Sequence, residues 1–144
     1  MSMRKIHGMV GIALMGLPQV LAGVILLKKS IPLFILFLAI AAVSVVGLLH
    51  SYCAKCGCRE TGCGHLFVGP LSAKLFPKTI PAPYTVVDYL ISLGPVLLLV
   101  ILPQPFLSTM QLLAYWGITA LGAIDIGFVV CKGCGDRQCL LHRS

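Results

Sequence analysis

Four long apolar stretches separated by short polar segments dominate the pattern of hydrophobic and polar positions along the chain. They cover residues 8–27, 32–49, 86–102 and 107–130. Each stretch, of roughly 17–24 residues, is long enough to cross a hydrocarbon core about 30 Å thick as a helix. Because backbone polar groups in lipid must bond within their own segment, the pattern predicts four transmembrane helices.

Short polar turns join these stretches in pairs. The sequence KKSIP, at residues 28–32, separates the first two stretches, and PQPF, at residues 103–106, separates the last two. Connections this short favour antiparallel neighbouring helices. The long connection at residues 51–85 contains several prolines, which argue against a long regular helix just before the third stretch. We therefore predict an all-α integral membrane protein built from two helical hairpins.

The composition supports this class. The chain is 58% hydrophobic and 10% charged, whereas a soluble domain carries about 25% charged residues, so a soluble protein with an apolar core is disfavoured. The first stretch also resembles a secretory signal peptide, because Arg4 and Lys5 precede it and a small residue, Ala22, lies near its end. The apolar run continues to Leu27, so we expect an uncleaved first span.

Basic residues are distributed unevenly between the two predicted sides of the membrane. An even number of spans places both termini and the long connection on one side. That side carries nine of the 11 Lys and Arg residues, and the other carries Lys28 and Lys29. The positive-inside rule places the nine in the cytoplasm, which predicts a cytoplasmic-membrane protein with both termini inside. The net charge of +7 is thus explained by topology, and no nucleic-acid partner is expected.

Two short cysteine-rich segments follow the second and fourth stretches. We call residues 53–65 the first cysteine segment and residues 131–142 the second. Their candidate metal ligands are Cys53, Cys56, Cys58 and Cys63, and Cys131, Cys134 and Cys139, with His65 and His142 as further candidates. Lasting disulfides are rare in a reducing cytoplasm, and Cys-x2-Cys spacing lets two thiolates converge on one metal. We therefore predict metal binding, at one composite site or at two adjacent sites.

The halves of the chain share an order of features. Each half has a hairpin with a proline in its first helix, Pro18 or Pro95, followed by a Cys-x4-Cys pair and a histidine. The corresponding cysteines and histidines lie 76 or 77 positions apart. This order predicts a parallel repeat about an axis along the membrane normal. Its units are residues 1–65 and 86–144, joined by a linker at residues 66–85 within one membrane domain.

The metal and the function stay open at this point. Zinc takes four ligands from Cys and His, iron–sulfur clusters take four thiolates as a rule, and copper also prefers soft ligands. Three functions follow: an electron-transfer module or subunit of a membrane redox complex, a zinc-stabilised protein that docks a partner or a second copy at the cytoplasmic face, and a soft-metal carrier. Nucleotide-binding and hydrolase motifs are absent from the sequence, so an enzyme acting on its own is not expected.

Two ionisable residues are expected at nearly equal depth in the membrane. Asp125 precedes Cys131 by six residues, about 9 Å along a helix, and His50 ends the second stretch. Asp125 is expected either to bond to a nearby helix or to water near the interface, or to form a proton or cation site beneath the metal. We also predict a contact between Asp125 and His50. Asp88 is expected near Lys74 or Lys78, and Lys55 is expected to offset thiolate charge.

Overall fold

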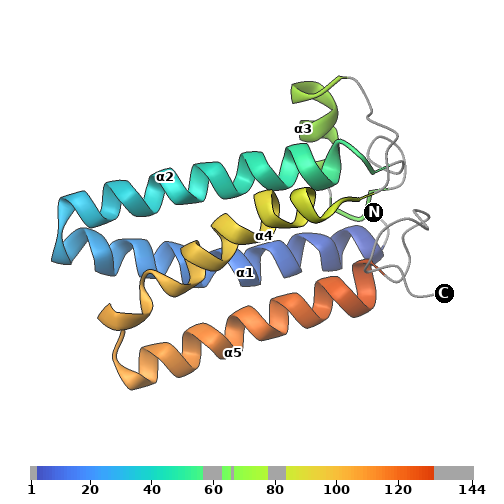
Figure 1. The fold of residues 1–144 in the computed structure, drawn as a ribbon. Helices are drawn as coiled ribbons and strands as arrows, with labels where there is room; N and C mark the ends of the chain where they lie inside the picture. Colours follow the sequence, from blue (N-terminus) through green and yellow to red (C-terminus); the bar gives the residue numbers. More distant parts are fainter. Residues whose placement is uncertain (1–2, 57–62, 66, 78–83, 132–144) are drawn as a thin grey trace.

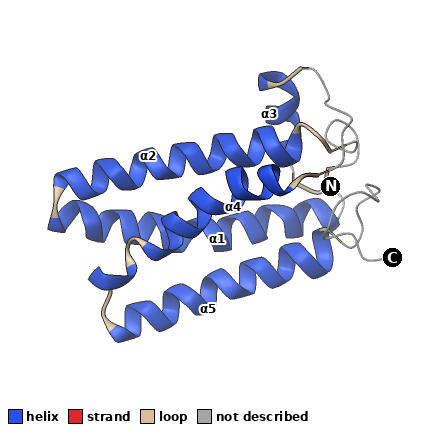
Figure 2. Ribbon diagram, in the orientation of Figure 1, coloured by secondary structure: helices blue, strands red, loops and turns tan. Residues whose placement is uncertain are grey.

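The fold is described from a computed structural model, for residues 3–56, 63–65, 67–77 and 84–131. Regular structure in these residues is helical throughout (Figure 2). The elements are α1 (Met3–Lys29), α2 (Ile31–Leu48), η1 (Leu49–Cys53), α3 (Val68–Leu75), α4 (Val86–Ile101), η2 (Gln104–Phe106), α5 (Thr109–Asp125) and η3 (Ile126–Val130). The elements η1 and η3 are π-helical turns, and η2 is a 3₁₀ turn.

Within the described residues, four helices are long and apolar enough to cross a membrane. They run over Met3–Lys29, Ile31–Cys53, Val86–Phe106 and Thr109–Val130. Most of their large apolar side chains are exposed, which suits contact with lipid. The predicted all-α architecture with four membrane helices is confirmed. The first three observed spans are longer than the predicted stretches by a few residues, and the fourth begins two residues later.

Local sequence explains where these helices break. Ser30 alone separates α1 from α2, and Pro32 lies in the first turn of α2, where its missing N–H costs nothing. Capping boxes open the other two spans, formed by Thr85 with Asp88 and by Ser108 with Gln111. Pro18 lies inside α1, which neighbouring helices in a membrane tolerate.

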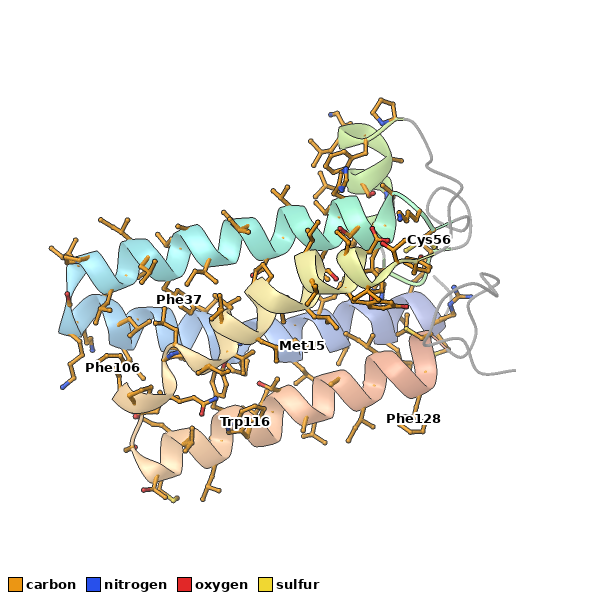
Figure 3. The ribbon with its side chains drawn as sticks, in the orientation of Figure 1. Met15, Phe37, Cys56, Phe106, Trp116 and Phe128 are labelled. Atoms are coloured by element: carbon orange, nitrogen blue, oxygen red, sulfur yellow. The ribbon has the colours of Figure 1, made fainter. Side chains whose placement is uncertain are left out.

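The first helix of each hairpin packs against the second helix of the other, an arrangement that we call crosswise packing. Figure 1 shows α1 between α2 and α5, and the closest packing joins α1 to α5 and α2 to α4. Glycines permit the approach, as is common between membrane helices. A Cβ on Gly122 would lie 3.0 Å from the Gly11 carbonyl oxygen, beside Met15 (Figure 3), and one on Gly47 would lie 2.7 Å from the Ile91 carbonyl oxygen. The first helix of each hairpin therefore packs on the second helix of the other.

One end of the bundle gathers the parts of the chain that carry the cysteine segments. The start of α1, the end of α2, the start of α4 and the end of α5 lie together there (Figure 1). Both second helices of the hairpins finish in π-helical turns, in which Ala54 N–H donates to the Leu49 carbonyl and Cys131 N–H donates to the Ile126 carbonyl, each at 2.9 Å. Such turns occur often at functional sites. The division into two repeated units stays a prediction.

Candidate metal centre at the cysteine-rich end

The described candidate ligands all belong to the end of the bundle just defined. They are Cys53, Cys56, Cys63, His65 and Cys131, and the four cysteines are half-buried. Figure 3 shows Cys56 at the same end of the bundle as Phe128 of η3. The remaining candidates, Cys58, Cys134, Cys139 and His142, lie outside the described residues.

An ion pair anchors the first cysteine segment to the start of α4. Lys55, between Cys53 and Cys56, donates from Nζ to Oδ2 of Asp88 at 2.6 Å, and both side chains are nearly buried. The same oxygen accepts from the backbone N–H and the hydroxyl of Thr85, each at 2.7 Å. Asp88 therefore pairs with Lys55 rather than with Lys74, and Lys78 lies outside the described residues.

Aromatic rings and the short helix α3 complete the anchoring. The rings of Tyr52, Tyr84 and Tyr89 pack together, with Tyr52 within 5.2 Å of Tyr84 and 5.7 Å of Tyr89 between centroids. Ser72 of α3 donates to the Leu49 carbonyl in η1 at 3.2 Å. The turn that leads into the first cysteine segment is thus held from two sides.

Residues 63–65, which we call the crossing segment, lie against the start of α1 and the end of η3. A Cβ on Gly64 would lie 2.5 Å from Cγ1 of Val130 and 3.0 Å from Nε of Arg4. A Cβ on Gly8 would clash with the Gly64 carbonyl oxygen and lie 2.9 Å from its carbonyl carbon. Only glycine at both positions permits this approach. The first cysteine segment therefore touches the residue that directly precedes Cys131.

The chemistry of the described ligands suits a soft metal. Cys63 lies within electrostatic range of Cys53. Burial lowers the pKa of His65 below its ordinary value, its hydrogen bond to the Gly8 backbone opposes this, and Arg4 lowers it further. A neutral imidazole is the form that binds metals, and the Nδ1 of His65 is buried without a hydrogen-bond partner in the described part of the chain. Among the described residues alone, no three His, Cys, Asp or Glu side chains converge as a metal site.

The predicted contact between His50 and Asp125 is wrong. The ring of His50 instead packs edge-on against Phe76, with centroids 5.2 Å apart. Asp125 pairs with His7 of α1, whose Nδ1 lies 2.8 Å from Oδ1. The physical reason is the crosswise packing, because it brings the start of α1, and not the end of α2, against the end of α5.

Several structural residues had no clear signal in the sequence. His7 was an isolated polar residue before an apolar stretch, and Gly8 and Gly64 were two glycines among 15. Gln19 donates to the Tyr115 hydroxyl at 2.6 Å in the middle of the bundle, a bond that depends on α1 and α5 being neighbours.

Comparisons with protein-family models, curated proteins and solved structures find no match to this chain.

Proposed function

We propose that this protein is a membrane-anchored metal protein whose two cysteine segments bind metal together at the cytoplasmic end of the helix bundle. The observation that carries the proposal is the contact between Gly64 and Val130. It joins the segment bearing Cys63 and His65 to the helix end bearing Cys131. Cys53 and His65 precede Cys131 by 78 and 66 positions in the sequence, and all three thus come from one end of one bundle.

The number of candidate ligands is sufficient for one composite site or two adjacent sites. Seven cysteines and two histidines in the segments allow two four-ligand sites, which fits either two zinc ions or iron–sulfur chemistry completed by a histidine. The Nδ1 of His65, buried and without a partner among the described residues, is the histidine atom best suited to ligation. Its lowered pKa keeps the ring neutral and ready to bind near pH 7.

An electron-transfer module is the function that we favour. Half-buried cysteines at a helix-bundle end would keep a cluster sheltered from water and still near the surface, where a partner's centre can approach. A cavity of about 280 Å³ between α1 and α5 has almost wholly apolar walls that include Leu21 and Ile118. Such a cavity offers few hydrogen-bonding groups to a polar substrate. We therefore propose that the protein works as a subunit of a membrane redox complex rather than as an enzyme alone.

A zinc-stabilised docking protein is the second candidate. The ion pair of Lys55 with Asp88 and the glycine contact at Gly64 already hold the first segment against three helix ends. A structural zinc ion would extend the same bracing to segments too short to form a core. The face so ordered would bind a protein partner or a second copy of the chain. A soft-metal carrier is the weakest of the three, because it needs polar groups across the whole membrane.

Metal and acid-labile sulfide analysis tests the proposal. The full chain would be purified without oxygen, and metal, sulfide and the absorbance spectrum would be measured on one sample. Iron with sulfide, and a brown colour that bleaches on reduction, supports the redox module. Colourless protein with one or two zinc ions per chain supports the docking protein. Protein with less than about 0.1 metal ion of any kind per chain, still folded as four helices, would contradict both.

A further inference from the structure

A histidine and a carboxylate meet between α1 and α5, apart from the candidate ligands. The Nδ1 of His7 lies 2.8 Å from Oδ1 of Asp125, and the His7 and Asp125 side chains are 39% and 19% exposed. The other carboxylate oxygen, Oδ2, is buried and has no hydrogen-bond partner within the described ranges. The pair is thus more open at the imidazole and more enclosed at the carboxylate.

The enclosure is built from apolar and small groups. A Cβ on Gly11 would lie 3.3 Å from Oδ2 of Asp125 and 2.6 Å from Cγ1 of Ile126. The glycine therefore lets α1 close over the carboxylate. Ile126 begins η3, whose five residues IGFVV carry no titratable side chain.

Among the described residues, the following charged or titratable groups lie on the segments next to this pair. On α1 they are Arg4 and Lys5, one turn or less before His7. The crossing segment contributes Cys63 and His65, and Cys131 follows η3. Tyr115 lies ten residues before Asp125 on α5 and is bonded to Gln19. Within the described residues, the hydrogen bond to the Asp125 carboxylate comes from His7.

A carboxylate in a membrane helix is costly, by about 2.5–3.5 kcal/mol on insertion scales, and usually marks a functional site. A structural tie between two helices needs only a neutral hydrogen bond, which Ser, Asn or Gln supplies. A histidine paired with a carboxylate does something that neutral groups do not, because the charge of an imidazole ordinarily changes between about pH 5 and 8. This choice of residues favours proton exchange over a purely structural role.

We propose that His7 and Asp125 form a proton-binding site at the cysteine-rich end of the membrane bundle. A proton arriving at Nε2 of His7 makes the ring an imidazolium whose Nδ1–H donates to Oδ1 of Asp125. The carboxylate balances the new positive charge, and loss of the proton from Nε2 restores the neutral ring. The exposed side of His7 is the route of exchange. The site stands on this geometry and does not require a metal.

The position of the His7–Asp125 pair near the cysteine segments suggests its role. Asp125 lies six residues before Cys131, about 9 Å along the helix. Bound charge at that distance in a low-dielectric setting interacts appreciably with charge on the thiolates. A proton taken up by the pair would offset negative charge gained at the cysteine segments.

Nuclear magnetic resonance of the full chain in lipid nanodiscs tests the site. The chain has only three aspartates, Asp88, Asp125 and Asp136, so ¹³C-carboxyl labelling of Asp with ¹⁵N labelling of His resolves the pair. From pH 5 to 8 the Asp125 and His7 signals should move with shared midpoints, as coupled groups do. His7→Gln should abolish the movement at Asp125, and Asp125→Asn should change the pH dependence of the His7 ring signals. The control Lys74→Gln, which removes an exposed charge on α3, should change neither signal.

Two results would overturn the proposal. One is an Asp125 carboxyl signal that stays constant from pH 5 to 8 in the unaltered chain, a measurement that depends on no variant. The other is a His7 titration that is the same in the parent chain and in a folded Asp125→Asn variant. Far-UV circular dichroism establishes that each variant is folded before its titration is compared.

Discussion

Lys55, which lies between the first two cysteines of the chain, places its Nζ 2.6 Å from Oδ2 of Asp88 at the start of α4. The bond connects the first hairpin to the second at the cysteine-rich end. The hydrogen bond from His7 to Asp125 makes a second connection at that end, between the start of α1 and the end of α5. Each aspartate in a membrane helix is therefore used to join the two hairpins.

Removing the carboxylate of Asp88 should loosen the first cysteine segment. We expect Asp88→Asn to lower the free energy of unfolding in mixed micelles by about 1–3 kcal/mol, between the values for exposed and buried ion pairs. In a double-mutant cycle with Lys55→Met, the two losses should overlap rather than add. Strictly additive losses would show that the pair contributes no energy of its own. Lys74→Met, at a lysine expected near Asp88 from the sequence, is the matched control and should cost little.

The glycine contact between α1 and the first cysteine segment gives a second prediction. Gly8→Ala puts a methyl group against the Gly64 carbonyl, and overpacking of this kind costs about 1–3 kcal/mol. The same substitution at Gly16 meets nothing within 4 Å and should be neutral or stabilising by up to about 1 kcal/mol, because alanine favours helix. Thermal unfolding of both variants in one detergent compares them. If the Gly8→Ala and Gly16→Ala variants were equally stable, the crossing segment would not lie against Gly8.

The hydrogen bond from Gln19 to Tyr115 tests the packing of α1 on α5 away from the cysteines. Tyr115 is 4% exposed and accepts from Gln19 at 2.6 Å. We expect Tyr115→Phe to destabilise the bundle by about 1 kcal/mol, the usual size of a bond between membrane helices. Because Gln19→Leu removes the same bond, the double variant should be little less stable than the worse single one. If the double variant lost the full sum of the two single losses in stability, the two side chains would not be bonded to each other.

The orientation in the membrane is tested by thiol labelling. A reagent that cannot cross membranes should modify the native cysteines in inverted vesicles, after a chelator has removed metal, but not in intact cells. A cysteine introduced at Ser30, in the turn between α1 and α2, should show the opposite pattern. Labelling of the native cysteines in intact cells and not in inverted vesicles would reverse the topology inferred from the basic residues.

The sequence was sufficient for the helices because the signal is collective. Runs of about 17–24 apolar residues have one stable form in lipid, and the prolines and polar residues at residues 28–32 and 103–106 mark the turns. The structure moved several helix ends by a few residues, notably through the capping box at Ser108, the 3₁₀ turn η2 and the π-helical turn η1. Such turns leave no pattern in the hydrophobic periodicity.

Pairings between distant residues were harder to predict, because they depend on which helices are neighbours. Asp125 was expected opposite His50, at equal depth, but depth alone does not choose a partner. The crosswise packing chose His7 instead. Asp88 likewise found Lys55 rather than Lys74, because the turn after α2 returns toward the start of α4. The shared metal centre and the internal repeat stay predictions, since several of their residues lie outside the described ranges.

The most direct test of the shared metal centre is the metal content per chain of four proteins purified side by side without oxygen. They are the unaltered chain, Cys63→Ser, Cys131→Ser and the double variant. If the two cysteine segments bind metal together, each single variant should lose as much metal as the double variant, because one missing thiolate disrupts ligands from both segments. Loss of separate, additive amounts in the two single variants, or full metal content in either one, would contradict a shared centre.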